Sequence, residues 1–181
     1  MTSDEILEKI FQPAIDMYIG LFIGGFSNDW EDRFEQYNGE HRSIYTHVTD
    51  SRYPSKAAVG AAARELFSEE LAQYYLNLTL EDMIVEENEY YNEAQREVFR
   101  QLPILTEKDG KLYTLDRSRG GYLAIETIRV ESQSENKTVY VLHAVSLWEP
   151  SEGDPVSEDY TYTRELIGGK WVFTTFPMDW L

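Results

Sequence analysis

The hydrophobic period of this chain changes at Pro103, and that change restricts the possible folds more than any other feature of the sequence. Before Pro103, apolar residues recur every three or four positions, as they do along one face of a helix. After it, apolar and polar residues alternate, as in strands with one buried face. Helices that precede strands, rather than alternating with them, are typical of an α+β fold. We expect N-terminal helices followed by a curved antiparallel β-meander of about five to six strands.

Start and stop signals predict the individual helices. The apolar positions from Leu7 to Phe22 predict a first helix, which Pro13 should kink or restart. Ser55 is placed to cap a second helix, and Ser68 offers a fresh cap for a third, "EELAQYYLN". A further helix is predicted in "NEYYNEAQREVFRQL".

Two pairs of residues predict hairpin turns in the second half of the chain. Asp109-Gly110 lies between "PILTEK" and "KLYTLD", and this pair suits the positive φ angles of a type I′ turn. Gly168-Gly169 should turn the last hairpin, between "YTYTRELI" and "KWVFTTF". We expect a single domain over residues 1–181, with the alternative of two packed lobes, 1–103 mainly helical and 104–181 an antiparallel sheet.

The net charge argues against several classes of partner. The 181-residue chain has 16 Lys and Arg against 33 Asp and Glu, a formal net charge of −17 at pH 7. This excess repels polyanions, so we expect no binding to nucleic acid. Because apolar residues are periodic rather than continuous, we also expect no membrane insertion. The acidity has two explanations that the sequence leaves open, solubility and electrostatic steering toward a basic protein partner.

The sequence lacks the motifs that usually carry chemistry. It has no cysteine, no G-x-S-x-G segment and no zinc-type spacing around His41 and His47. Carboxylates are so numerous that spacing alone selects no acid–base pair. We therefore predict a protein that is not an enzyme, with no catalytic residues, no metal site and no cofactor. The first residues show no signal-peptide pattern, which predicts a cytoplasmic location by default.

Two groups of residues are candidates for binding. The first lies in and after the acidic loop "EPSEGDPVSED", on a long connection between strands, where scaffolds often display binding residues. The residues predicted to contact a partner are Glu149, Glu152, Asp154, Glu158 and Asp159. The second group is a set of ring side chains that could line a pocket for a small apolar molecule or pack within the sheet. Its members are Tyr140, His143, Tyr160, Tyr162 and Trp171.

One locally basic segment, Asp116–Tyr122, has the sequence "DRSRGGY". Its two arginines and two glycines could cradle an anion with guanidinium groups and backbone amides. The same residue types are typical of a surface turn between strands, and both interpretations stay open.

Three segments in a fixed order give the sequence a family resemblance. They are "YTHVTDSRYPSKAAVGAAARELFSEELAQYYLN", "KDGKLYTLDRSRGG" and the terminal "YTRELIGGKWVFTTF". Over Tyr45 to Phe176, this order resembles the IseA-type family of DL-endopeptidase inhibitors and related extracytoplasmic domains of Gram-positive bacteria. The resemblance implies a protein that blocks the substrate cleft of a papain-like cell-wall DL-endopeptidase and restrains peptidoglycan cleavage. It also implies an extracytoplasmic location.

Two other functions are compatible with the same pattern of elements. Helices on a strongly curved sheet are similar to the cone-shaped fold of nuclear transport factor and ketosteroid isomerase, which implies binding of a small apolar ligand. An accessory or sensor domain of a surface protein is the third alternative. A sheet whose concave face is filled by its own side chains would favour protein binding, whereas an open cavity would favour a small ligand.

Overall fold

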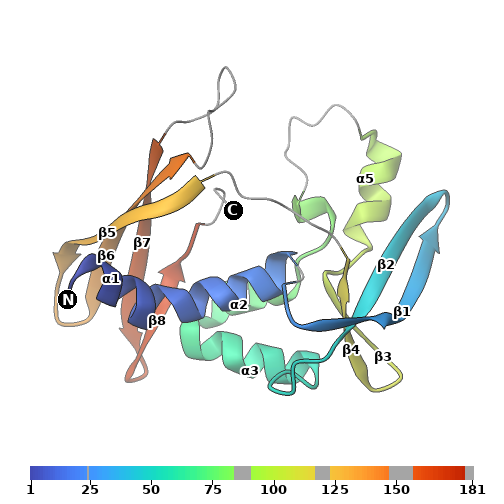
Figure 1. Cartoon of the computed structure of the whole chain (residues 1–181), viewed down its shortest axis with the longest axis horizontal. Coiled ribbons are helices and arrows are strands. Elements are labelled where there is room, and N and C mark those ends of the chain that lie inside the picture. The colour runs from blue at the N-terminus through green and yellow to red at the C-terminus, as the bar shows by residue number, and fades with distance from the viewer. Residues whose placement is uncertain (24, 84–90, 117–122, 147–156, 178–181) are drawn as a thin grey trace. The chain divides into compact units, whose positions relative to one another are not determined.

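The computed structural model describes residues 1–23, 25–83, 91–116, 123–146 and 157–177. It contains helices and two four-stranded antiparallel sheets, which confirms the α+β class (Figure 1). The chain forms two compact units. Unit 1 comprises Met1–Asp16, Arg64–Leu71 and Arg119–Leu181, and unit 2 comprises Met17–Ala63 and Ala72–Ser118. The units alternate along the sequence, and the expectation of a single domain over residues 1–181 stays a prediction.

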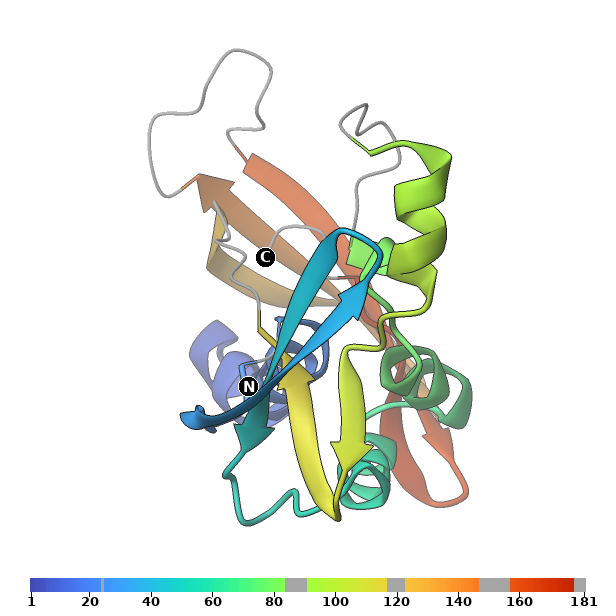
Figure 2. The ribbon, with the colours of Figure 1, turned by 90° about the vertical axis from the view of Figure 1, so that its right-hand side faces the viewer.

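Unit 2 contains the first sheet, sheet A, in the strand order β1-β2-β4-β3. One hairpin consists of β1 (Asn28–Asn38) and β2 (His41–Val48), and the other of β3 (Leu105–Lys108) and β4 (Lys111–Leu115). Figure 2 shows the first pair in blue and cyan and the second in yellow. The hairpins join through β2 and β4, which pair only over Tyr45–His47 of β2. β4 therefore covers only part of the edge of β2.

The turn of the β3–β4 hairpin confirms the sequence prediction. Asp109 has a φ of 51° and Gly110 a φ of 75°. Both angles are positive, as a type I′ turn requires, and the turn leads Lys108 directly into its pairing with Lys111.

The β1–β2 hairpin is an element that the sequence analysis did not predict. The described residues form eight strands in two sheets, where a single meander of five to six was expected. β1 has no fully buried residue, so its sequence lacks the apolar alternation that identifies a strand. The available signal was Asn38-Gly39 at the turn, where Gly39 has a φ of 64°.

Unit 1 contains the second sheet, sheet B, an antiparallel meander in the order β5-β6-β7-β8 (Figure 1). Its strands are β5 (Leu123–Gln133), β6 (Lys137–Ser146), β7 (Ser157–Ile167) and β8 (Lys170–Thr175). Gly168 and Gly169 have φ angles of 59° and 82° and turn the chain from β7 into β8, as the sequence predicted. The strands that follow residue 122 thus keep the predicted meander order.

The N-terminal helix is interrupted by a wider turn. Its three parts are α1 (Ser3–Ile6), the π-helical turn η1 (Leu7–Phe11) and α2 (Gln12–Ile23). In the π turn, the N–H of Gln12 donates to the carbonyl of Leu7, five residues earlier. Pro13 follows at once, and proline cannot donate to the preceding turn. The helix therefore changes its hydrogen-bond pattern directly before Pro13, the residue at which the sequence predicted a kink or restart.

Two serine caps predicted from the sequence are confirmed. The remaining helices are α3 (Lys56–Leu66), α4 (Glu69–Leu76), the 3-10 turn η2 (Glu81–Met83) and α5 (Glu93–Arg100). Ser55 Oγ accepts a hydrogen bond from the N–H of Ala58 at 3.1 Å, and Ser68 Oγ accepts one from the N–H of Leu71 at 3.3 Å. Each bond satisfies a backbone donor that the first turn of a helix leaves unpaired. In the part of the chain that the structure describes, no helix is long and apolar enough to cross a membrane.

The core of unit 2 is organised around Tyr45 of β2, which is fully buried. The ring of Phe34 stacks on it with centroids 5.0 Å apart, and the Tyr45 hydroxyl donates to the carbonyl of Pro103 at 2.9 Å. That hydrogen bond ties β2 to the segment that enters β3. A buried tyrosine is tolerated here because its hydroxyl has a partner.

Candidate functional site

The inner face of sheet B, defined by Tyr140 and Tyr162, is filled by an aromatic core. Phe11 of η1 is fully buried, and its ring meets those of Tyr140 and Tyr162 edge-on, with centroids 5.3 and 5.0 Å apart. Phe173 adds another edge contact at 5.2 Å, and Phe176 lies at 6.2 Å. These distances fall within the ~4.5–7 Å range of favourable aromatic pairs. The two tyrosines predicted to line a pocket therefore pack against the N-terminal helix.

The other members of the predicted aromatic set lie elsewhere on sheet B. Tyr160 is buried, and its hydroxyl donates to Glu158 Oε2 at 2.6 Å. Trp171 on β8 is half-buried, and its carbonyl accepts a hydrogen bond from Arg164 at 3.0 Å. His143 follows the buried Leu142 on β6 and so points to the opposite, outer face of the sheet. The structure thus brings Tyr140, Tyr160 and Tyr162 to one face but places His143 on the other.

Two of the five acidic residues predicted to contact a partner lie within the described residues, at the start of β7. Glu158 and Asp159 are both exposed there, whereas Glu149, Glu152 and Asp154 lie outside the described residues. Asp159 Oδ1 is 2.6 Å from Nδ1 of His143, which is its partner in the β6–β7 register. The structure therefore joins one residue of the predicted pocket to one residue of the predicted partner surface.

Charged neighbours surround this histidine and aspartate on the outer face of sheet B. Oε2 of Glu126 lies 3.6 Å from Nε2 of His143, and Oδ2 of Asp159 lies 3.9 Å from the Arg129 guanidinium. On this face the carboxylates of Glu126 and Asp159 outnumber the one arginine, whereas Glu158 lies on the other face with Tyr160. The surface is acidic, but Asp159 already has partners of its own. We call residues Ser157–Thr161, with their side chains, the acidic strand end.

Backbone groups of the acidic strand end point to an open edge. The last pair of the β7–β8 ladder joins Thr163 to Thr175, and the N–H of Thr163 donates to Thr175 Oγ1 at 2.9 Å. Alternate residues of a strand direct their backbone groups to the same edge, so those of Asp159 and Thr161 face the side on which β8 has ended. Among the residues that the structure describes, no strand pairs with Asp159 or Thr161 on that side.

A second polar cluster surrounds Asp32, in the bulge of β1. Its carboxylate accepts hydrogen bonds from Lys111 Nζ at 2.6 Å and from the Tyr113 hydroxyl at 3.1 Å, and His47 Nδ1 lies 3.1 Å away. The bond from Lys111 lowers the pKa of Asp32 and raises the pKa of Lys111. Burial, and then the bond to Asp32, raises the pKa of Tyr113. These partners stabilise an ionised carboxylate and so favour an ion-pair network over an acid–base catalyst.

His47, which the sequence analysis judged unsuitable as a zinc ligand, therefore takes part in this network. His41 lies at the other end of β2, where its ring meets that of Phe99 edge-on with centroids 4.8 Å apart. Within the described ranges, no group of three or more histidine, aspartate or glutamate side chains is placed to hold a metal ion. Of the basic segment "DRSRGGY", only Asp116 lies within the described residues.

Glu35 of β1 is the carboxylate whose titration departs furthest from its ordinary range. It is bonded to the guanidinium of Arg42 on β2, and the Tyr37 hydroxyl donates to its Oε2 at 2.7 Å. The Arg42 bond, followed by that of Tyr37, lowers the pKa of Glu35 to about 2 from its ordinary value of 4.5. The same pairing raises the pKa of Arg42. The positive charge of Arg42 is thus already matched within sheet A.

The lowered pKa of Glu35 predicts how stability depends on pH. A carboxyl whose pKa is lower in the folded state stabilises the fold above its unfolded pKa, and that contribution is lost as pH falls through the folded value. Glu35 should therefore stabilise sheet A above pH 4.5 and lose this effect between pH 4.5 and about 2. In Glu35→Gln, the free energy of unfolding should fall less than in the wild type as the pH is lowered through this interval. Urea unfolding at several pH values measures the difference. The control is Glu131→Gln, at an exposed position of β5.

An equal loss of stability on acidification in the wild type and in Glu35→Gln would contradict the role of this ion pair. High salt should weaken the difference between them, because both side chains are partly exposed to solvent.

Comparison with known proteins does not place the chain in a family. No model of a known protein family matches the sequence, and no curated protein shows a significant match to it. The geometry of the described residues is therefore the basis for a functional proposal.

Proposed function

We propose that this protein is a non-enzymatic, acidic binding protein whose partner is a basic protein surface. The observation that carries the proposal is the acidic strand end of β7. It combines the exposed side chains of Glu158 and Asp159 with backbone groups of Asp159 and Thr161 that face an edge with which no described strand pairs. An extended segment of a partner can add to such an edge through main-chain hydrogen bonds, while opposite charge guides the encounter.

The packing of sheet B supports protein binding over the alternative of a small apolar ligand in the concavity of the sheet. Phe11 occupies the inner face between Tyr140, Tyr162 and Phe173, so these side chains form a core. What the sheet offers to a partner is its outer face and its edge. The net charge of −17 adds long-range attraction toward a basic surface.

A cell-wall DL-endopeptidase is the specific partner we propose, and this choice rests on the resemblance of the sequence to IseA-type inhibitors. Docking on the substrate cleft of such an enzyme would restrain peptidoglycan cleavage without any chemistry by the inhibitor. An extracytoplasmic location belongs to the same proposal. The broader proposal of a basic protein partner stands on the acidic strand end alone.

The test is titration of a purified papain-like DL-endopeptidase with the full chain at low and at high salt. We expect inhibition that weakens as salt increases, because screening reduces attraction between exposed charges. The double substitution Glu158→Gln with Asp159→Asn should weaken binding about tenfold at low salt, and less at high salt. The matched control removes the same number of charges at exposed positions of the same unit, with Glu131→Gln and Glu135→Gln.

A separate variant tests the open edge without changing charge. Thr161→Pro removes a backbone donor that faces this edge, where proline is tolerated because no described strand pairs with that N–H. Weaker binding by a variant with an unchanged circular dichroism spectrum would support strand addition.

An absence of inhibition at micromolar protein and low salt would contradict the choice of an endopeptidase as the partner. If binding does not depend on salt and the Glu158 and Asp159 substitutions do not weaken it, the acidic strand end is not the binding site.

A further inference from the structure

The two edge strands of sheet B are each hydrogen-bonded to a residue outside the sheet. On β5, the N–H of Ile128 donates to Ser3 Oγ at 2.8 Å. On β8, the carbonyl of Phe173 accepts a hydrogen bond from the N–H of Ser68 at 2.8 Å. Such bonds matter because an edge strand otherwise presents unpaired backbone groups with which another chain can pair.

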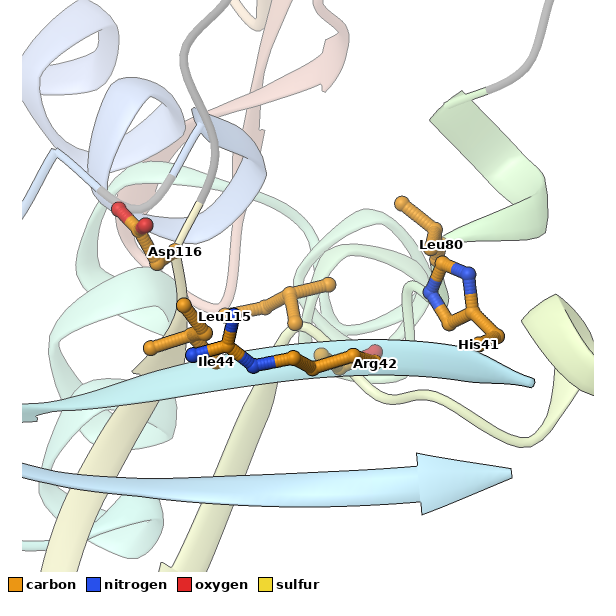
Figure 3. Close-up of a pocket in the computed structure, with 7 residues that line it drawn as sticks. His41, Arg42, Ile44, Leu80, Leu115 and Asp116 are labelled. Carbon is orange, nitrogen blue, oxygen red and sulfur yellow. The ribbon is translucent and has the colours of Figure 1, made fainter. Parts of the chain in front are cut away.

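In sheet A, the outer edge of β3 and the uncovered part of β2 are also occupied. Nζ of Lys56 donates to the carbonyl of Leu105 on β3 at 3.5 Å. Where β2 extends past β4, its edge borders a cavity of about 200 Å³, whose lining includes Leu80 and Leu115 (Figure 3). This volume is below the ~300–1,000 Å³ of pockets for drug-sized ligands, so the cavity has no room for an added strand.

β1 is the remaining edge strand, and its backbone groups alternate between β2 and the outer side. The N–H of Asp116 donates to the carbonyl of Ile44 at 2.7 Å, so the backbone of Ile44 is directed to the β4 side. Glu35 is the β1 partner of Ile44, and its own N–H and C=O are therefore directed away from β2. The same holds for Arg33 and Tyr37, two residues to either side. In the described part of the chain, no strand pairs with these three residues on that side.

The part of β1 that can accept a strand is Arg33–Asn38. A bulge lies before it, between Asp29 and Arg33, and interrupts the ladder there. The segment contains no proline that would remove a backbone donor. Tyr37 is 63% exposed on it, so the segment also offers aromatic surface. A regular edge with these properties is of the kind that pairs with another strand.

The charges of this segment select a second copy of the chain as the partner. Its charged residues are one arginine and one glutamate, Arg33 and Glu35, so it is neutral and does not favour a basic partner. In an antiparallel pair of β1 strands, a two-fold axis at Phe34 places Arg33 of each copy opposite Glu35 of the other. Axes at Arg33 or at Glu35 would place like charges opposite each other, which is destabilising. The axis at Phe34 also forms an aromatic cross-strand pair.

We propose that this protein forms a two-fold symmetric dimer in which the Arg33–Asn38 segments of two copies pair antiparallel about Phe34. Arg33 and Glu35 exchange main-chain hydrogen bonds across the axis, and their side chains form ion pairs between the copies. Sheet A then continues from one copy into the other. The interface lies in unit 2 and does not use the acidic strand end, which lies in unit 1.

The first test is sedimentation equilibrium of the full chain over a range of concentrations at low and at physiological salt. We expect reversible association of monomers with a dissociation constant in the micromolar range, typical of a small interface. Association should strengthen as salt increases, because salt screens the repulsion between copies that each carry a charge of −17. This dependence is opposite to that expected for a basic partner. A chain that stays monomeric at hundreds of micromolar and physiological salt would overturn the proposal.

Charge reversal tests the register. Arg33→Glu places like charges opposite each other at both ion pairs and should weaken association about tenfold, as should Glu35→Arg. Mixed together, these two variants should associate with each other, because every pair then joins opposite charges. Arg52→Glu is the matched control, since Arg52 is 75% exposed in the same unit and lies outside β1. Failure of the two variants to associate, or equal weakening by Arg52→Glu, would overturn the proposed pairing.

Amide hydrogen exchange at protein concentrations below and above the dissociation constant locates the interface. The N–H groups of Arg33 and Glu35 should exchange rapidly in the monomer and slowly in the dimer. The N–H of Phe34 is directed to β2 and should be protected in both. A dimer in which the N–H of Glu35 still exchanges rapidly forms through another surface and would contradict the proposal.

Discussion

Phe11→Ala is expected to lower the free energy of unfolding by about 3–5 kcal/mol, the range for large-to-small substitution of a buried aromatic residue. Phe11 is fully buried and is in ring contact with Tyr140, Tyr162 and Phe173. Its removal deletes these contacts and leaves a cavity that strands of a sheet cannot easily close. The measurement is equilibrium urea unfolding followed by circular dichroism at neutral pH.

Two further variants keep this prediction testable. Because domains are typically stable by only ~5–15 kcal/mol, the alanine variant can fail to accumulate, and Phe11→Leu then gives a smaller, measurable loss. Ile167→Ala is the control, since Ile167 is 50% exposed at the end of β7 in the same unit. A cost for Phe11→Ala no larger than that for Ile167→Ala would show that the inner face of sheet B is not filled as described.

Gly20→Ala is expected to destabilise unit 2, although alanine is the better helix former. Within α2 the substitution would gain about 1 kcal/mol from helix propensity alone. A Cβ atom at Gly20, however, would lie less than 3.0 Å from three ring atoms of Phe26. Phe26 is buried, and its ring lies 5.0 Å from that of Tyr53, so it has little room to retreat. Overpacking of this kind costs about 1–3 kcal/mol, which outweighs the gain in propensity.

A double-mutant cycle isolates this contact. Phe26→Ala alone should be strongly destabilising, because it empties a buried site. Added to Phe26→Ala, the Gly20→Ala substitution should cost nothing or become favourable, since the clashing ring is gone and only the propensity gain remains. Equal effects of Gly20→Ala in the presence and absence of the Phe26 ring would contradict the close approach. Urea unfolding of the four proteins supplies the comparison.

Local signals in the sequence predicted local structure well. Ser55 and Ser68 cap helices, and Asp109-Gly110 and Gly168-Gly169 form turns, because each depends only on residues a few positions away. The β1–β2 hairpin was missed for a physical reason. β1 buries no residue fully, so hydrophobic alternation is weak, and only Asn38-Gly39 marked its turn.

The candidate sites depended on register between distant segments, which the sequence does not show. His143 meets Asp159 because the β6–β7 ladder places them opposite each other, 16 residues apart in the chain. The cavity exists because β4 ends its pairing at Tyr45 of β2 while β2 continues to His41. Periodicity predicts that strands exist, but not where one strand outruns its neighbour.

The π-helical turn at Leu7–Phe11 means that chain length, and not only residue type, is under constraint near the N-terminus. A π turn holds one residue more than an α-helix of the same rise. Deleting one residue there would yield a continuous α-helix but would rotate everything before it by roughly 100°. Ser3, whose Oγ accepts a hydrogen bond from the N–H of Ile128 at 2.8 Å, would turn away from β5, as would the buried Ile6. A homologue that is one residue shorter at this point is therefore expected to have lost that anchor, so a single gap in an alignment would report a structural change.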